Sequence, residues 1–228
     1  MMTASWNVDA TKILSRREIA SVLNDIKRRA RRSVNSRMNL TIFRLAACCG
    51  LRASETTGLR LSDVRLGIDR PYIYVSRGIA KGRKARRVPL WWDRGTLDDL
   101  TAWKDSRLIQ GAGQSDYFVC SQSRSAFGRR LDRRNARARF ICACRVLGGD
   151  RQAALTIHHG RHSFVSHALA GGRSLAEVRD AAGHSNIAMT GLYTHVATED
   201  SLAIHDLFGP LSPAGYVMGD SGEPGATH

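Results

Sequence analysis

The stretch YIYVSRGIAKGRKARRVPL, residues 72–90, decides the predicted fold class, because it holds the strand signals of a chain whose other segments predict helices. Its first part, YIYVS (72–76), is rich in β-branched and aromatic residues, and RRVPL (86–90) forms a second short run. The polar segment between the two runs contains glycine, which favours a turn. The stretch therefore predicts two antiparallel strands joined by a basic loop.

Helical patterns flank this hairpin on both sides. SRRE (15–18) has the spacing of a capping box and predicts a helix that runs toward Arg32. Apolar residues between 40 and 46 predict a second helix ending at Gly50, and Thr96–Asp99 predicts the start of another, with acids in its first turn. Further helices are expected over residues 128–147, 160–170, 174–182 and 186–196. The predicted fold class is therefore mainly α with a small antiparallel β-sheet (α+β).

The charge of the chain indicates its partner. The 228 residues include 35 Lys and Arg against 20 Asp and Glu, a formal net charge of +15. Such an excess, dominated by arginine, favours contacts with phosphates, and nucleic acid is the expected polyanion. No segment approaches the length of apolar sequence that spans a bilayer, and the N-terminus lacks the pattern of a secretory signal. We therefore expect no membrane partner, and a cytoplasmic, nucleoid-associated protein.

Cysteine and histidine spacing argues against a metal site. The five cysteines form no C-x-x-C pair and lie in apolar stretches, so they are expected to be reduced and packed as small hydrophobic residues. His158 and His162 have H-x-x-x-H spacing, but no Glu follows the first His and no third ligand has suitable spacing. No metal site is predicted.

Two groups of basic residues are predicted to contact DNA phosphates. The first shares one face of the helix expected over 128–147 and comprises Arg129, Arg130, Arg133, Arg134 and Arg137. The second lies in the hairpin loop and comprises Arg83, Lys84 and Arg86. For both groups the alternative is a charged surface that contacts only water.

Five motifs carry residues that suit phosphate chemistry. In chain order they are CGLRASE with Arg52 and Glu55, IAKGRKARRVPL with Lys81, IHHGRHSFVSHAL with His158 and Arg161, AAGHSN with His184, and LYTHVATED with Tyr193. Taken singly, each residue has an ordinary structural interpretation. Taken together, the motifs resemble the catalytic domain of the tyrosine recombinase (phage integrase) family, over roughly residues 12 to 205.

This resemblance implies a reaction on DNA. Tyr193 would attack a phosphodiester, giving a 3′-phosphotyrosyl link and a free 5′-hydroxyl. Arg52 and Arg161 would bind the non-bridging oxygens as planar forks, and His184 would hydrogen-bond the same phosphate. The function expected is that of a site-specific recombinase or integrase.

The remaining roles are also implied by the resemblance. Lys81, in the hairpin loop, would be the general acid for the leaving 5′-oxygen. His158 would be the general base or a phosphate contact, and Glu55 would support the site. Neither a metal nor another cofactor is required, because the phosphotyrosine conserves the bond energy.

Two other functions remain open. A type IB topoisomerase uses similar residues to nick and reseal one strand, and a catalytically silent regulator would keep the basic faces and bind DNA without cutting it. Formation of a covalent DNA adduct, followed by strand exchange between two sites, distinguishes the three.

The resemblance implies a catalytic domain over residues 12–208, preceded by an extension over 1–11. Most members of the family also carry a separate N-terminal core-binding domain, for which the residues before the first predicted helix are too few, so none is expected. Residues 209–228 are rich in Gly, Pro and Ser and are predicted to form a flexible tail. A monomer in solution and a tetramer on DNA are expected, with residues 199–208 docking onto a neighbouring protomer or, alternatively, onto their own domain. Gly160 and Ala182 stand where the family often has leucine, which predicts looser packing around the site.

Overall fold

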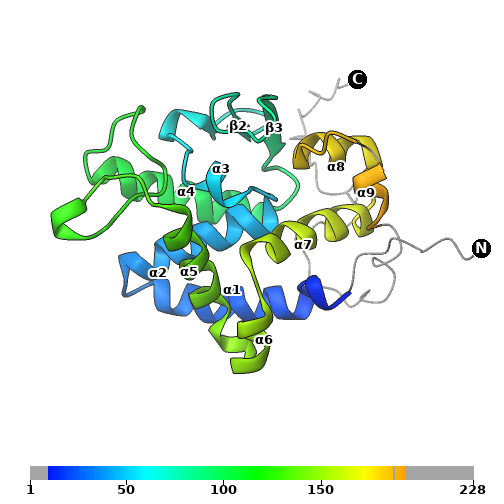
Figure 1. Cartoon of the computed structure of the whole chain (residues 1–228). Helices are drawn as coiled ribbons and strands as arrows, with labels where there is room; N and C mark the ends of the chain where they lie inside the picture. Colours follow the sequence, from blue (N-terminus) through cyan, green and yellow to red (C-terminus); the bar gives the residue numbers. More distant parts are fainter. Residues whose placement is uncertain (1–9, 187, 194–228) are drawn as a thin grey trace, which may run out of the picture.

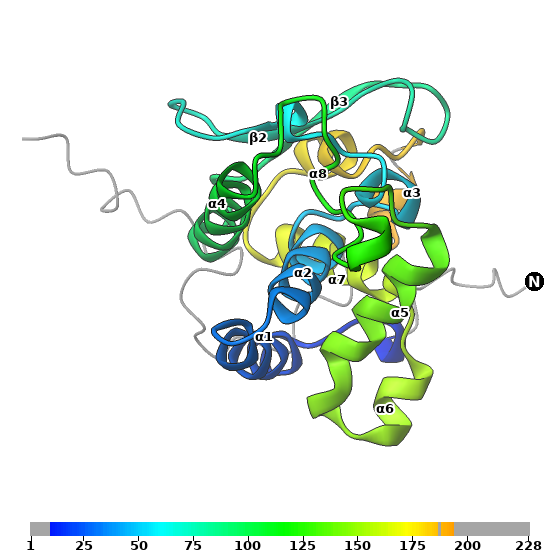
Figure 2. The same ribbon diagram turned by 90° about the vertical axis from the view of Figure 1, so that its left-hand side faces the viewer.

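The computed structural model describes residues 10–186 and 188–193 of the chain. The docking segment 199–208, the tail 209–228 and the second half of the helix expected over 186–196 lie outside these residues. Within them, helices surround one small sheet, so the predicted fold class is confirmed (Figure 1). The sheet lies at one end of the molecule, and α1 and α6 lie at the other (Figures 1 and 2).

The helices before the sheet are η1 (Ala10–Lys12), α1 (Arg16–Ala30), α2 (Val34–Phe43), a π-helical segment η2 (Arg44–Cys48), α3 (Ala53–Thr56) and η3 (Leu61–Asp63). Those after it are α4 (Arg94–Ile109), η4 (Arg124–Ala126), α5 (Arg133–Ala143), η5 (Cys144–Leu147), α6 (Gly149–Ala154), α7 (Ile157–Ala170), α8 (Leu175–Ala182) and α9 (Ala188–Gly191). Among the described residues, no helix has the length and apolar character needed to cross a bilayer.

The sheet contains three antiparallel strands, β1 (Val64–Arg65), β2 (Tyr72–Val75) and β3 (Arg86–Pro89), in the order β1-β2-β3. Ile73 pairs with Val64 on one side and with Val88 on the other, and all three side chains are buried. The predicted hairpin is confirmed. Strand β1 was not predicted, because two residues are too short to give a periodic signal.

Helix starts follow the capping residues more closely than the apolar pattern. Ser15 and Ser174 each form the predicted capping box, at the starts of α1 and α8. The second helix begins earlier than predicted, at Val34, because Ser33 accepts a hydrogen bond from the backbone of its first turn. The start predicted at Thr96–Asp99 was wrong. Asp93 caps α4, and Thr96 lies inside the helix with its hydroxyl bonded to that carboxylate.

The long helix predicted over 128–147 was also wrong. Gly128 has a φ of 79°, in the left-handed region where a right-handed helix cannot continue, and α5 begins only after its cap, Asp132. Arg130 instead pairs in an extended bridge with Cys120. The helix then tightens into the 3-10 turn η5 after Ala143. Two of the five arginines assigned to this helix therefore lie before it.

The core is built where α7 packs against η2 and α5. A Cβ added at Gly160 of α7 would lie 2.9 Å from a ring carbon of Phe140 and 3.2 Å from the Cβ of Ala46. The expectation of loose packing at Gly160 was therefore wrong, because Phe140 and Ala46 fill the space that a larger side chain would occupy. Ala182 is likewise fully buried. Of the five cysteines, only Cys142 is exposed.

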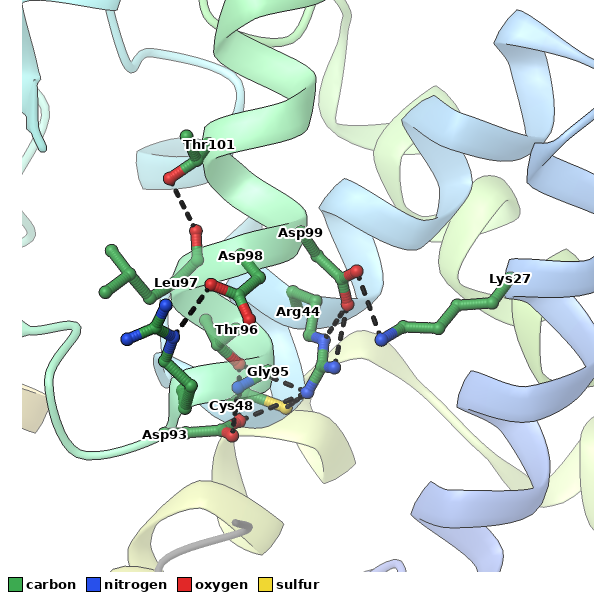
Figure 3. Close-up of polar contacts among 11 residues, drawn as sticks. Lys27, Arg44, Cys48, Asp93, Gly95, Thr96, Leu97, Asp98, Asp99 and Thr101 are labelled. Atoms are coloured by element: carbon green, nitrogen blue, oxygen red, sulfur yellow. Dashed lines mark hydrogen bonds and ion pairs between the residues drawn. The ribbon is translucent and has the colours of Figure 1, made fainter. Parts of the chain in front are cut away.

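A buried ionic network fixes η2, which leads directly into the candidate site, against α4 (Figure 3). Arg44, 3% exposed, donates to Asp99 over 2.8 Å and to Asp93 over 3.1 Å. Arg44 also donates to the hydroxyl of Thr96, and Lys27 forms an ion pair with Asp99. Removing one member of such a network leaves its partners charged and without water.

We therefore expect Arg44→Met to lower the free energy of unfolding by about 3–5 kcal/mol, since Asp93 stays buried without its cation. Chemical denaturation of both proteins measures the difference. Arg94→Met is the matched control. Arg94 is the first residue of α4, and its ion pair with Asp98 is exposed, so losing that pair should cost no more than about 0.5 kcal/mol. Equal losses in the two variants would contradict a structural role for the buried network.

Candidate active site

Arg52 lies at the base of the site, where a buried carboxylate holds it. Arg52, just before α3, donates from its backbone and its side chain to the carboxylate of Glu55, over 2.9 and 3.1 Å. Its other terminal nitrogen lies 3.5 Å from the carbonyl oxygen of Gly183, beside His184. Glu55 is fully buried and its carboxylate holds the arginine, whose side chain is 19% exposed. The supporting role of Glu55 stays a prediction, and the two hydrogen bonds are what it would act through.

Arg86 corrects the prediction that it contacts DNA. It lies on β3 with its side chain 7% exposed, and both terminal nitrogens donate to Glu55 over 2.9 and 2.7 Å. Its Nε donates to the carbonyl of Ala181 at the end of α8. Burial raises the pKa of Glu55, but the hydrogen bonds and charge of Arg86, with those of Arg52, hold it below its ordinary value. Arg86 is thus buried and shares the carboxylate of Glu55 with Arg52.

Arg161, by contrast, is a buried cation whose neutralisation is incomplete. It is 6% exposed on α7, and one terminal nitrogen donates to the carbonyl of Gly50 over 2.6 Å. Its other terminal nitrogen has no hydrogen-bond partner among the described residues. Burial, and then repulsion by Arg52, lowers the pKa of Arg161. A buried charge costs free energy until an anion reaches it, so the site is prepared for an anion.

Gly50 makes this placement possible. Its φ of 65° lies in the left-handed region, and a Cβ there would lie 2.4 Å from the ring of Phe164. A residue with a side chain would thus be strained and would collide with α7. The carbonyl of Gly50 consequently turns toward Arg161.

Two histidines border the two arginines. His184 lies in the turn after α8, as predicted, and its Nδ1 lies 2.9 Å from the hydroxyl of Thr190. Burial, followed by the charge of Arg161 and Arg52, lowers the pKa of His184 to about 4. His158 reaches the surface of α7, yet the surrounding protein lowers its pKa, and so do four nearby cations: Arg137, Arg161, Arg52 and Lys81. Both imidazoles are therefore uncharged at neutral pH and able to donate one hydrogen bond each.

Lys81 lies exposed in the loop between β2 and β3, where it was predicted. The next two residues, Gly82 and Arg83, both have positive φ, so the loop turns sharply just after the lysine. Arg83 and Lys84 are exposed in the same turn. Their side chains are thus available to a polyanion, unlike that of Arg86.

The basic residues near α5 divide into two kinds. Arg133, Arg134 and Arg137 are exposed on the helix, and the charge of Arg137 reaches His158, so this face adjoins the site. Arg130 precedes the helix, donates to the carbonyl of Thr57 and lies over the ring of Tyr117. Arg129 is exposed and directly precedes Arg130. A single five-arginine helical face, as predicted, does not exist.

Tyr193 lies in the turn that follows α9, and not two turns into a helix as predicted. It is 5% exposed, and its hydroxyl lies 2.5 Å from Nδ1 of His162. The rings of His162 and His184 lie 5.6 and 6.5 Å from its ring, in nearly parallel orientation. Burial raises the pKa of Tyr193, although Arg161 acts in the opposite direction. The hydroxyl therefore keeps its proton at neutral pH.

Two features were missed by sequence analysis. The contact of His162 with Tyr193 was not foreseen, since this histidine was considered only as a metal ligand. A hollow of about 720 Å³ is lined mainly by arginines near the α1–α2 junction: Arg28, Arg29, Arg31, Arg32 and Arg145. The run IKRRARR in this region is the sequence signal that could have revealed this second concentration of charge.

The arrangement can bind an anion between two arginines and two neutral histidines, beside an exposed lysine and a buried tyrosine hydroxyl. Such an anion would face a candidate nucleophile, a candidate acid and candidate bases. No group of three His, Cys, Asp or Glu side chains suited to a metal ion occurs in the part of the chain that the structure describes.

Known proteins share this sequence pattern and fold. The sequence model of the Phage integrase family matches residues 12–200. Tyrosine recombinase XerC of Mycobacterium tuberculosis (strain ATCC 25177 / H37Ra) is 35% identical over 166 residues, which are 72% of this chain and 52% of that protein. Tyrosine recombinase XerD of Proteus mirabilis is 35% identical over 167 residues, 71% of this chain and 49% of that protein. The chain thus spans about half the length of the curated relatives it matches.

Solved structures support the fold. The crystal structure of XerA recombinase has a TM-score of 0.65 at 22% identity, with 85% of this chain and 61% of that chain covered. The XerH site-specific recombinase bound to its difH substrate in a pre-cleavage complex has a TM-score of 0.63 at 23% identity, with 81% and 50% covered.

Proposed function

Because the chain belongs to the Phage integrase family, we propose that it holds the catalytic region, over residues 12–208, of a site-specific DNA recombinase. In this proposal the protein cleaves and rejoins DNA through a 3′-phosphotyrosyl intermediate. The observation that carries it is Arg161, a buried arginine with one terminal nitrogen unpaired, lying near a buried tyrosine hydroxyl. That combination supports a phosphate held in front of a nucleophile.

In the proposed complex the scissile phosphate occupies the space between Arg52 and Arg161. The unpaired nitrogen of Arg161 donates to one non-bridging oxygen, and the exposed part of Arg52 donates to another. His184 and His158 donate the hydrogen bonds that neutral imidazoles can provide. Charge that develops on the phosphate during attack is stabilised by donors already fixed by Glu55 and Gly50.

Bond breaking requires a proton for the leaving 5′-oxygen, and Lys81 is the proposed donor. Its position on an exposed loop leaves its side chain available to DNA, whereas the tyrosine is buried. Arg83, Lys84 and the exposed arginines of α5 hold the neighbouring phosphates in this proposal, which places the hairpin and α5 along the same duplex.

Strand exchange is proposed to take place in a multimer on DNA. Exchange between two duplexes needs a nucleophile for every strand that is cut, and one chain offers one Tyr193. A tetramer meets this requirement, with double-stranded DNA as the partner and the nucleoid of the cytoplasm as the location where that substrate is found.

A pool of duplexes with randomised cores tests this function. The protein is incubated with the pool and denatured in SDS, and the DNA that remains attached is sequenced together with any new junctions. We expect protein linked to 3′-phosphates, free 5′-hydroxyls and junctions that join two different duplexes. Adducts without new junctions, in which each cut strand is resealed to its own duplex, would identify a topoisomerase. DNA binding without adducts would identify a silent regulator.

A further inference from the structure

The hydroxyl of the proposed nucleophile has a specific partner, His162. The two groups lie 2.5 Å apart, between Nδ1 of the imidazole and the phenol oxygen. His162 follows Arg161 directly on α7, so a rigid helix holds both the phosphate-binding nitrogen and this imidazole. The contact is also supported by ring packing, since the two rings lie 5.6 Å apart at an interplanar angle of 27°.

Burial and nearby charges decide the protonation states of the two groups. Burial, followed by His159, His158 and Arg161 on α7 and Lys12 on η1, lowers the pKa of His162 to about 4. Burial raises the pKa of Tyr193. At neutral pH both groups are therefore uncharged, and in the imidazole tautomer that carries its proton on Nε2 the tyrosine donates and Nδ1 of His162 accepts.

The other two histidines of the site, His158 and His184, have different partners. His158 reaches the surface among four cations, which is the environment of a phosphate ligand. His184 directs its Nδ1 to the hydroxyl of Thr190. Among the hydrogen bonds of the described residues, the one made by the Tyr193 hydroxyl is to His162.

We propose that His162 is the general base that accepts the proton of Tyr193 when the tyrosine attacks DNA. This inference rests on the proposed recombinase function. The O–H bond of Tyr193 breaks as its proton moves to Nδ1 of His162, and the phenolate oxygen forms the bond to phosphorus. The bond from phosphorus to the 5′-oxygen breaks, and that oxygen takes its proton from Lys81.

Binding of the substrate strengthens this base. A phosphate next to Arg161 offsets the positive charge that disfavours protonation of His162 in the empty site. Imidazolium formation then becomes easier at the moment when the phosphate is in place. A tyrosine without bound DNA would keep its proton.

The test compares variants at His162 on a DNA selected from the randomised pool. His162→Asn keeps an acceptor oxygen near the position of Nδ1 but cannot take up a proton at neutral pH. We expect the rate of covalent adduct formation to fall roughly 10²–10⁴-fold, the range typical of a lost general base. In the unmodified protein the rate should fall as the pH drops below the pKa of His162 in the complex, and this dependence should be absent from His162→Asn.

His162→Ala provides a second measurement, because it leaves space for added imidazole. Imidazole should restore part of its rate and should not accelerate His162→Asn. His159→Gln is the matched control, because it removes a neighbour that lowers the pKa of His162 but leaves His162 itself in place. Its pH dependence should therefore persist, shifted toward higher pH, and added imidazole should not accelerate it. Thermal unfolding and DNA binding of each variant show whether folding or substrate binding has changed.

The outcomes separate this inference from the function on which it rests. If the unmodified protein forms no adduct with any DNA, both are overturned. If it forms adducts and His162→Asn reacts as fast or faster, with an unchanged pH profile, His162 is not the base and only this inference fails. If His162→Asn does not fold, a failure of imidazole to restore His162→Ala overturns the inference.

Discussion

Tyr193→Phe is expected to abolish covalent adduct formation, and not merely to slow it. Phenylalanine keeps the ring that packs near His162 and His184, so the buried area and the fold are retained. The substitution removes the hydroxyl that would attack phosphorus, together with one hydrogen bond worth about 1 kcal/mol. SDS gels of protein incubated with selected DNA measure the adduct, and a binding titration measures affinity.

Affinity for DNA should change little in this variant, because the phosphate contacts proposed for Arg52 and Arg161 are intact. An SDS-stable adduct formed by Tyr193→Phe would show that another residue is the nucleophile. In that case the proposed roles of His162 and Tyr193 would both be wrong, although family membership would stand.

Lys81→Ala is expected to slow cleavage of ordinary DNA by roughly 10²–10⁴-fold, because the leaving 5′-oxygen would depart without a proton. The rate should recover on DNA in which sulfur replaces that bridging oxygen, since a thiolate leaves without protonation. Rates of adduct formation on the two substrates give the comparison directly.

Lys84→Ala supplies the control for this experiment, because Lys84 is exposed in the same turn of the hairpin loop. It should weaken DNA binding at moderate salt, in keeping with loss of one phosphate contact, and its reaction should gain nothing from the sulfur substitution. Sulfur rescue of both variants, or of neither, would exclude Lys81 as the general acid.

Local sequence predicted those parts of the fold and site that short segments encode. The capping boxes at Ser15 and Ser174 and the alternation in the hairpin lie within a few residues, and the structure bears them out. The predicted family is confirmed by the match over residues 12–200. The structure also brings the candidate site residues together, whereas their chemical roles remain predictions.

Two of the errors came from interactions between distant segments, and a third came from the backbone conformation of one residue. Arg86 was grouped with the exposed loop cations because its partner, Glu55, lies 31 positions earlier in the chain. The five-arginine face failed because a single left-handed glycine, Gly128, outweighs helical spacing. His162 gave no local signal of its contact with Tyr193, 31 positions later, since that contact depends on how α9 folds back over α7.

The close fit around Gly160 has a consequence for how sequences of this kind can diverge. A leucine at position 160 requires Phe140 to move, because its Cβ would already lie 2.9 Å from that ring. A smaller residue at 140 without a larger one at 160 would instead leave a void. The side chains at the two positions therefore share one fixed volume, and the size of each limits the size of the other.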